Sequence, residues 1–357
     1  MKKGCLLLLS MLLLTYGYQG YKIIDRHIHD EVKIKTSGKL SDITSHVMPV
    51  PLETPGSGVV CQAKRVQRDG NHLFLIDNGR LLHYNISGKF INQLAAEISN
   101  SEDIFIADYT LDTEYHQIIL IDSQRNISKY DYAGNLVSKA KITHPWHKLT
   151  AFAYHNGYLW VTAEKLVNNS NDTDSFQIEH NLYQLDCDMH EISNQRLYTA
   201  ELGRDIPLHS NCVDELFVDE QGVYAYSSPA NMKYLLDDTL HIVQYQNLPM
   251  MRRNKQEEGA YIYPVRKGKR HIVSTYYNTT NDGYIFCFDN MNHTAYMLTD
   301  GFQDDFYHTG YVTDLQSMDV YNQAYCFLKS GDDTAGTFPD RGIHNDNPVL
   351  FIITLNS

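Results

Sequence analysis

The chain has 357 residues and a formal net charge of −13, with 30 basic and 43 acidic side chains. An acidic surface without a basic run argues against nucleic acid or an anionic membrane as the partner. The apolar fraction of 43% excludes a wholly disordered chain and is ordinary for a globular protein.

The first 17 residues are typical of an export signal. Two lysines precede an apolar stretch from Cys5 to Leu14, and Thr15 and Gly17 place small residues for cleavage after Gly17. That stretch is too short for a stable membrane anchor, and no later segment is long and apolar enough to cross a bilayer. Cys5 precedes the apolar stretch, whereas a lipid-attachment cysteine would follow it, so lipidation is not supported. We expect a mature chain without a transmembrane segment, exported to the periplasm or to the outer face of the cell envelope.

Residues 18–41 are polar and show no sustained period, so they are predicted to be a linker before a single domain at residues 42–357. The first strand of that domain is predicted at Val47–Glu53. It contains two prolines, which remove hydrogen-bond donors and are tolerated only at the edge of a sheet.

From Leu73 onward, one pattern recurs about every 45 residues. A hydrophobic strand that ends in Asp, such as Leu73–Asp77 or Ile118–Asp122, is followed by a second strand and a turn centred on Gly88 or Gly134. A repeat of this length built of strands alone is typical of β-propeller blades. Each blade buries its faces only against its neighbours, so the pattern predicts a complete ring.

Six sets of strands are predicted in chain order. Blade one is expected at Ala63–Arg68, Leu73–Asp77, Arg80–Asn85 and Lys89–Leu94, and blade two at Asp103–Ala107, Gln117–Asp122, Ile127–Tyr132 and Leu136–Ile142. Blade three is expected at Leu149–Tyr154, Tyr158–Glu164, Asn181–Asp186 and Ile192–Tyr198, with Lys165–His180 as an exposed polar loop. Blade four is expected at Glu215–Asp219, Val223–Ser227, Lys233–Leu236 and His241–Tyr245, and blade five at Tyr261–Arg266, His271–Tyr277, Gly283–Asp289 and Thr294–Thr299.

The sixth set has only three predicted strands, at Val312–Tyr321, Gln323–Lys329 and Val349–Leu355. The strand at Val47–Glu53 supplies the fourth, which closes the ring by pairing the two ends of the chain. We therefore predict an all-β fold, a six-bladed β-propeller with four-stranded antiparallel blades whose ring is closed by an N-terminal strand that joins the last blade.

Three short segments, Val50–Thr54, Leu82–Phe90 and Asn345–Leu350, resemble those of exported bacterial six-bladed β-propellers, in both order and placement. That group is related in shape to NHL-like and TolB-like propellers. The resemblance covers essentially all of residues 42–357 and brings no catalytic motif with it. Many members carry a lipid-attachment cysteine after the signal, and this chain has none there.

Two residue types have simple structural interpretations. Cys287 and Cys326 alternate with apolar residues, so both are predicted to be small buried side chains of strands. Asp77 and Asp122 recur at one position of the repeat, which favours hydrogen bonding to turn backbone over catalysis.

Candidate ligand-binding residues lie in the connections between blades, which surround one mouth of the central channel in a propeller. His, Arg, Asp and aromatic side chains suit a polar ligand such as a sugar, which they bind by stacking and hydrogen bonds. The predicted set is Trp146, His147, Arg204, His209, Arg253, Asp304, Tyr307 and His308. The alternative is that these are ordinary loop residues and that Trp146 packs over a blade edge.

No nucleophile–base motif or regular metal-binding spacing is present in the sequence. We therefore expect a monomeric, non-enzymatic binding or scaffolding propeller without a cofactor, which recognises a glycan or an envelope protein at the channel mouth. The alternative is a metal-assisted hydrolase or lyase that acts on a lactone or saccharide. Such an enzyme would hold one divalent cation in the channel with ligands from different blades, which sequence spacing does not reveal.

Overall fold

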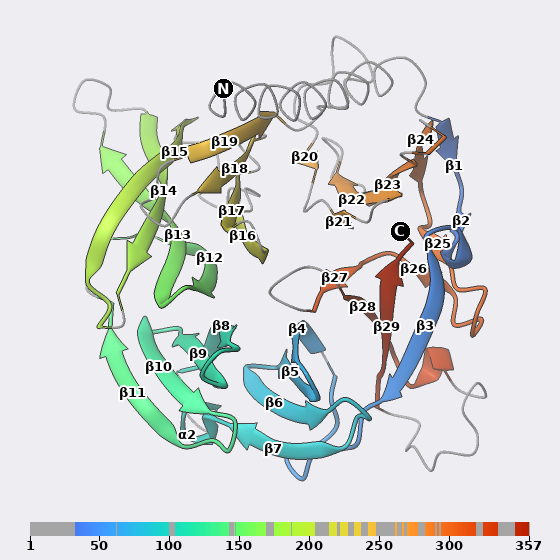
Figure 1. The fold of residues 1–357 in the computed structure, drawn as a ribbon, viewed down its shortest axis with the longest axis horizontal. Coiled ribbons are helices and arrows are strands. Elements are labelled where there is room, and N and C mark those ends of the chain that lie inside the picture. Colours follow the sequence, from blue (N-terminus) through green and yellow to red (C-terminus); the bar gives the residue numbers. More distant parts are fainter. Residues whose placement is uncertain are drawn as a thin grey trace, which may run out of the picture.

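The computed structural model arranges its strands in sheets around one axis (Figure 1). It describes residues 33–356 except residues 62, 100–103, 143–145, 147, 169–174, 187, 204–213, 220–221, 228–231, 237–241, 248–260, 263–265, 268–269, 278–282, 290, 293, 319–323 and 335–346. Within this part of the chain, six sheets form successive blades and a small three-stranded sheet lies between the last two. The predicted six-bladed all-β fold is confirmed.

Blades one and two have the same antiparallel layout. Blade one contains β4 (Ala63–Asp69), β5 (His72–Asp77), β6 (Arg80–Asn85) and β7 (Phe90–Leu94). The short helix α2 (Ala96–Ser99) follows, and blade two contains β8 (Ile106–Asp112), β9 (Gln117–Asp122), β10 (Asn126–Asp131) and β11 (Leu136–Lys141). The second strand of each blade is buried from its second residue to its end, because neighbouring blades cover both of its faces.

The first strand of blade two differs from the predicted Asp103–Ala107, since β8 begins at Ile106 and continues to Asp112. Tyr109 and Leu111 are 0% and 1% exposed and pack in the core between blades one and two. The residues from Tyr109 to Asp112 are all buried and pair with β9, which extends the strand beyond the predicted end.

Asn and Asp side chains form the turns of the repeat. Asn85 Oδ1 accepts hydrogen bonds from the backbone N–H groups of Ser87 and Lys89, at 3.0 and 2.9 Å. Asp122 Oδ1 accepts two backbone bonds of 2.9 Å in the same way, and Asp77 Oδ1 accepts the N–H of Cys61 at 2.9 Å. The predicted role of Asp77 and Asp122 in backbone hydrogen bonding is confirmed.

Blade three is the longest sheet. It contains β12 (Lys148–His155), β13 (Tyr158–Asn168), β14 (Ser175–Leu185) and β15 (Glu191–Gly203). The predicted polar loop at Lys165–His180 is wrong for most of its length, because β13 and β14 stay paired from Leu159–Leu185 to Asn168–Phe176. Ile178 is only 1% exposed, so apolar alternation maintains the ladder despite the polar composition nearby.

Blade four contains β16 (Asp214–Asp219), β17 (Gly222–Ser227), β18 (Met232–Leu236) and β19 (Ile242–Asn247). In blade five, two short strands, β20 (Tyr261–Ile262) and β21 (Arg266–Lys267), share the partner β22 (His271–Tyr277). The sheet continues through β23 (Gly283–Asp289) and β24 (Thr294–Leu298).

Blade six joins the two ends of the chain. It contains β27 (Gln316–Ser317), β28 (Tyr325–Lys329), β29 (Val349–Leu355) and β3 (Thr44–Pro51), with the 3₁₀ turn η2 (Asp332–Thr334) before β29. β3 pairs antiparallel with β29, with Val50 opposite Leu350 and Val47 opposite Ile353. The predicted closure by an N-terminal strand is confirmed, and the innermost strands β27, β4, β8, β12 and β16 contact one another in that order.

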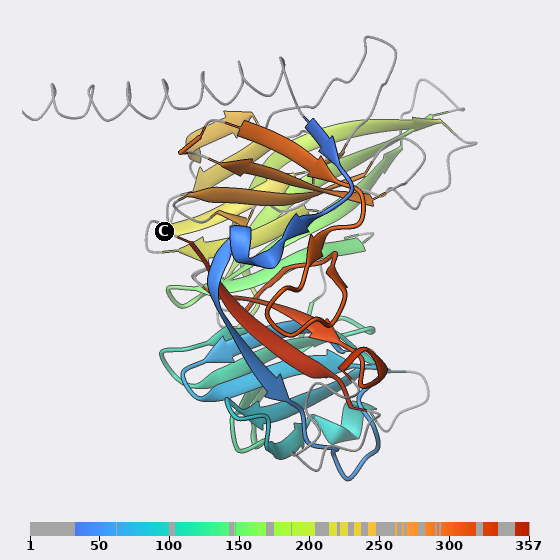
Figure 2. The same ribbon diagram turned by 90° about the vertical axis from the view of Figure 1, so that its right-hand side faces the viewer.

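The chain before β3 is also attached to the ring, although residues 18–41 were predicted to be a linker. β1 (Lys33–Lys35) pairs in parallel with β24 at the outer edge of blade five. β2 (Gly38–Lys39) pairs with β25 (Phe302–Gln303), which pairs with β26 (Tyr311–Val312), and the 3₁₀ turn η1 (Leu40–Asp42) leads into β3. Figure 2 shows this segment, residues 33–51, running along blades five and six, and we name it the N-terminal strap.

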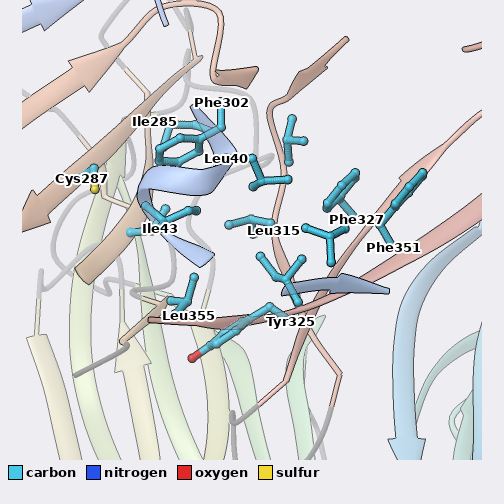
Figure 3. Close-up of a cluster of buried hydrophobic side chains, with 14 of the residues drawn as sticks. Leu40, Ile43, Ile285, Cys287, Phe302, Leu315, Tyr325, Phe327, Phe351 and Leu355 are labelled. Carbon is cyan, nitrogen blue, oxygen red and sulfur yellow. The ribbon is translucent and has the colours of Figure 1, made fainter. Parts of the chain in front are cut away.

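The strap contributes to the core. Leu40 and Ile43 are fully buried among Ile285 of blade five, Phe351 of blade six and Phe302 of β25 (Figure 3). The parallel rings of Phe327 and Phe351 stack at 4.8 Å in the same cluster. Leu40 lies among the polar residues of the predicted linker, so its buried position was not apparent from the sequence.

The three short segments that resemble those of exported six-bladed propellers lie together where the ring closes. Glu53 N donates to Gly88 O at 2.8 Å, and Phe90 N donates to the Glu53 carboxylate at 2.9 Å. Leu52 N donates to Pro348 O at 3.3 Å, and the Asn347 side chain contacts the Thr54 hydroxyl. The shared motifs therefore hold blade one against the strand that completes blade six.

Two smaller expectations are also tested. Cys287 and Cys326 are both fully buried, as predicted. Among the described residues, no helix has the length and hydropathy needed to span a membrane.

Candidate functional site

Polar and aromatic side chains gather where the hairpins of blades one and two lie side by side. Asp69 ends β4, His72 begins β5 and His83 lies in β6, while His116 precedes β9 and Tyr132 follows β10. We call these five residues the polar cluster. In each antiparallel blade, the hairpin between strands one and two and the hairpin between strands three and four lie at the same end of the ring. We call this the hairpin end, and the polar cluster lies there. The sequence-based prediction instead put the binding residues at the opposite end, the junction end, where one blade connects to the next.

Asp69 holds the outer half of the polar cluster together. Its Oδ2 accepts a hydrogen bond from the Tyr132 hydroxyl at 2.8 Å and lies 3.0 Å from His116 Nδ1. The side chains of Asp69 and His116 are 18% and 67% exposed. The Tyr132 ring lies 5.1 Å from the ring of His72 and 5.6 Å from that of His116. A carboxylate, two imidazoles and a phenol ring thus meet at the surface.

A chain of hydrogen bonds leads from His72 through His83 to blade two. His72 Nδ1 lies 2.8 Å from His83 Nε2, and His83 Nδ1 lies 3.0 Å from Asn92 Oδ1. Asn92 Nδ2 donates to the carbonyl of Ala133, in blade two, at 3.1 Å. His83, in the middle of the chain, is 1% exposed, and the bond from Asn92 to Ala133 links blade one to blade two at the surface.

The surroundings shift two pKa values in the polar cluster. Burial lowers the pKa of His83 to about 4 from 6.5, which outweighs the opposing hydrogen bond to Asn92. Burial also raises the pKa of Tyr132, and the hydrogen bond and charge of Asp69 add to that shift. Both side chains are therefore neutral at pH 7.

A second acid–tyrosine contact lies nearby. Asp112 is 3% exposed, accepts the N–H of Tyr115 at 3.2 Å, and hydrogen-bonds the Tyr154 side chain. Burial and this carboxylate raise the pKa of Tyr154, and the charge of Asp112 also acts on Tyr132. Tyr115, next to His116, is 64% exposed, so an aromatic side chain is available to solvent beside the polar cluster.

The buried neutral His83 predicts acid lability. Its folded pKa is depressed, so between pH 6.5 and about 4 the unfolded chain binds more protons than the folded one. The stabilisation is complete above pH 6.5 and is lost as pH falls toward 4, by up to about 3 kcal/mol. We expect urea unfolding to show a steep loss of stability over this window, and the slope to flatten in His83→Gln.

His46→Gln is the control for this experiment, since His46 is an exposed histidine in the strap. Its stability should keep the pH dependence of the unsubstituted protein. An unchanged slope in His83→Gln would contradict the assignment of acid lability to His83.

The structure describes four of the eight predicted binding residues. Trp146 is 3% exposed in the core between blades two and three, with its ring 4.8 Å from that of Tyr183. Asp304 is fully buried and holds its own loop, because its carboxylate accepts the backbone N–H groups of Phe306, Tyr307 and Thr309 at 3.1 to 3.2 Å. Both side chains thus contribute to the local structure.

Tyr307 and His308 follow Asp304 in the same loop. The Tyr307 hydroxyl donates to the carbonyl of Val47 in β3 at 3.3 Å, and its ring packs 5.6 Å from Phe351. His308 is exposed, with a left-handed φ of 59°. Since Trp146 and Tyr307 pack against different core clusters, the structure does not bring these parts of the predicted set together.

The other four predicted residues, His147, Arg204, His209 and Arg253, lie outside the described residues. Ligand binding by the set therefore stays a prediction. In the described part of the chain, no three His, Cys, Asp or Glu side chains are grouped to hold a metal ion. Metal analysis of the purified protein would test the predicted alternative of a divalent cation.

Sequence reasoning missed the polar cluster, although a signal for it was present. In blades one and two, an Asp ends the innermost strand and a His follows within the next few residues, at Asp69–His72 and Asp112–His116. The recurrence of both residue types at one hairpin of the repeat indicated a shared surface.

The chain belongs to the family described as 6-bladed beta-propeller, whose sequence model matches residues 22–323. Its fold is similar to the crystal structure of a Bacteroides fragilis protein described as exported, with a TM-score of 0.62 and 14% identity over 91% of this chain and 99% of that one.

Two further solved structures have lower similarity, each with a TM-score of 0.43. Raptor from Chaetomium thermophilum is 10% identical over 87% of this chain and 28% of that one. A luciferin-regenerating enzyme is 14% identical over 86% of this chain and 95% of that one. No curated protein matches the sequence.

Proposed function

We propose that this chain is an exported, non-enzymatic binding propeller that recognises a glycan at the hairpin end of blades one and two. The observation that carries the proposal is the meeting of Asp69, His72, His116 and Tyr132 at the surface. Carboxylates and imidazoles hydrogen-bond sugar hydroxyls, and aromatic faces stack on sugar rings. The exposed Tyr115 adds a further aromatic face beside them.

Two observations support the exported part of this proposal. The first 17 residues are typical of an export signal. The fold is also similar to that of a protein described as exported. A binding module at the cell envelope would meet polysaccharides there, and an acidic surface suits a partner that is not anionic.

A glycan array probed with the mature protein tests the proposal. We expect at least one bound glycan, and a loss of affinity of about tenfold or more in Asp69→Asn, because the charge-assisted hydrogen bonds of the carboxylate are removed. Glu114→Gln is the matched control, since Glu114 is an exposed carboxylate in the neighbouring hairpin, and its binding should be unchanged.

Arg253→Ala separates this proposal from binding at the junction end. If that substitution abolishes binding and Asp69→Asn leaves it intact, the ligand lies at the junction end and the proposed site is wrong. Capture of an envelope protein with no glycan bound would overturn the glycan assignment. Melting temperatures within about 3 °C of the unsubstituted protein would show that each variant is folded.

A further inference from the structure

The ring of His83 is held in one orientation. It stacks on the fully buried ring of Phe74, with the two centroids 4.4 Å apart and an angle of 22° between the planes. Its two nitrogens have different partners, since Nδ1 lies 3.0 Å from Asn92 Oδ1 and Nε2 lies 2.8 Å from His72 Nδ1. A turned ring would lose both hydrogen bonds and leave buried polar atoms without partners, which is unfavourable.

One carbonyl group sets the direction of these hydrogen bonds. The oxygen of Ala133 can only accept, so the amide of Asn92 turns Nδ2 toward it, at 3.1 Å, and Oδ1 toward His83. His83 Nδ1 must therefore carry a proton. Because burial lowers the pKa of His83 to about 4, the ring is neutral at pH 7 and its Nε2 carries no proton. His83 thus donates to Asn92 and accepts from His72.

This acceptor in turn holds His72. Its Nδ1 lies 2.8 Å from the unprotonated Nε2 of His83, so His72 Nδ1 carries a proton whether the His72 ring is neutral or charged. The other nitrogen, Nε2, points away from His83, and no described residue bonds to it. The His72 ring is half-buried beside Tyr132, at 5.1 Å. Nε2 is therefore the atom that His72 can offer to a ligand.

We propose that Asn92 and His83 are positioning residues of the glycan site, which hold His72 with Nδ1 inward and Nε2 toward the sugar. This inference rests on the proposed function and deepens it, because it names the atom of His72 that meets the glycan and the residues that orient it. His83 is 1% exposed, and Asn92 uses its amide on His83 and Ala133, so both act through His72. A side chain fixed before binding need not be ordered in the complex, which raises affinity.

The proton positions of the two histidines test the assignment in the free protein. Long-range ¹H–¹⁵N NMR spectra distinguish a protonated ring nitrogen from an unprotonated one. At pH 7 we expect the His83 proton on Nδ1, and in Asn92→Ala a shift of that proton to Nε2, because the acceptor that favours Nδ1 is gone. Asn92→Asp is the matched control, since it keeps an oxygen opposite Nδ1. A proton on Nε2 of His83 in the unsubstituted protein would overturn the assignment.

Binding of the glycan that gives the strongest array signal tests the positioning. A glutamine amide reaches about as far as Nε2 of a histidine, and an asparagine amide only as far as Nδ1. We expect His72→Gln to bind within about threefold of the unsubstituted protein, and His72→Asn to lose about tenfold, the value of one good hydrogen bond. Asn92→Ala should weaken binding by about two- to tenfold, and Asn92→Asp by less.

The outcomes separate the two proposals. Equal affinities of His72→Gln and His72→Asn, or an unchanged affinity of Asn92→Ala, would overturn the positioning inference. The proposed function would still hold in that case if Asp69→Asn loses binding. If Asp69→Asn binds as tightly as the unsubstituted protein, the proposed function fails. If no array glycan binds, both proposals fail, even where the proton positions agree with the assignment.

Discussion

A chain that lacks residues 1–54 is expected to lose cooperative unfolding or to aggregate. The deletion removes the N-terminal strap and the three residues after it. Five buried side chains are lost, each between 0% and 4% exposed: Leu40, Ile43, Val47, Val50 and Leu52. Burial of an aliphatic side chain stabilises a protein by about 1.5–3 kcal/mol, so the loss is on the order of 10 kcal/mol. That is comparable to the whole stability of a typical domain, about 5–15 kcal/mol. The deletion also leaves β29 with an open edge.

A shorter deletion, of residues 1–32, is the matched control. It retains β1, β2 and β3, so its melting temperature should equal that of the mature protein. A peptide of residues 33–54, added to the longer deletion, should restore stability in a concentration-dependent manner if it rebinds along blades five and six. An unchanged melting temperature in the longer deletion would disprove ring closure by the strap.

The strands could be predicted where the chain repeats one local pattern. β5 and β9 match the predicted segments to within one residue, because a buried strand between two blades reads as a continuous apolar run bounded by turn residues. The strap differs, since β1 and β2 are three and two residues long and pair with strands more than 260 positions away. No local pattern carries such a pairing.

The candidate site was harder to predict for the same reason. Topology alone places the blade connections at one end of the ring, but it does not say which side chains fold back into the protein. Asp304 was predicted to bind a ligand, but its carboxylate accepts hydrogen bonds from the backbone of its own loop. That loop follows β25, which pairs with the distant strand β2. His83 resembled an ordinary strand residue, yet it lies at the centre of the polar cluster. Both outcomes depend on contacts between distant segments.

Gly88→Ala is expected to destabilise the protein far more than the equivalent substitution in the next blade, Gly134→Ala. Both glycines occupy the turn after the third strand with left-handed φ angles, 83° and 95°. An alanine in that conformation costs about 1–2 kcal/mol at either position. At Gly88 the added Cβ would also overlap the carbonyl oxygen of Pro51 in β3, whereas at Gly134 its nearest neighbours are 3.5 Å away. Relieving the overlap requires a backbone shift at the ring closure, which costs roughly a further 1–3 kcal/mol or more.

The difference between the two variants isolates the contact between the turn of blade one and the strap, because the conformational cost is common to both. Urea unfolding should therefore give a stability for Gly88→Ala that is at least about 2 kcal/mol below that of Gly134→Ala. Equal destabilisation by the two substitutions would show that the turn of blade one does not pack against β3. It would also contradict the conclusion that the three shared motifs hold blade one against the strand that completes blade six.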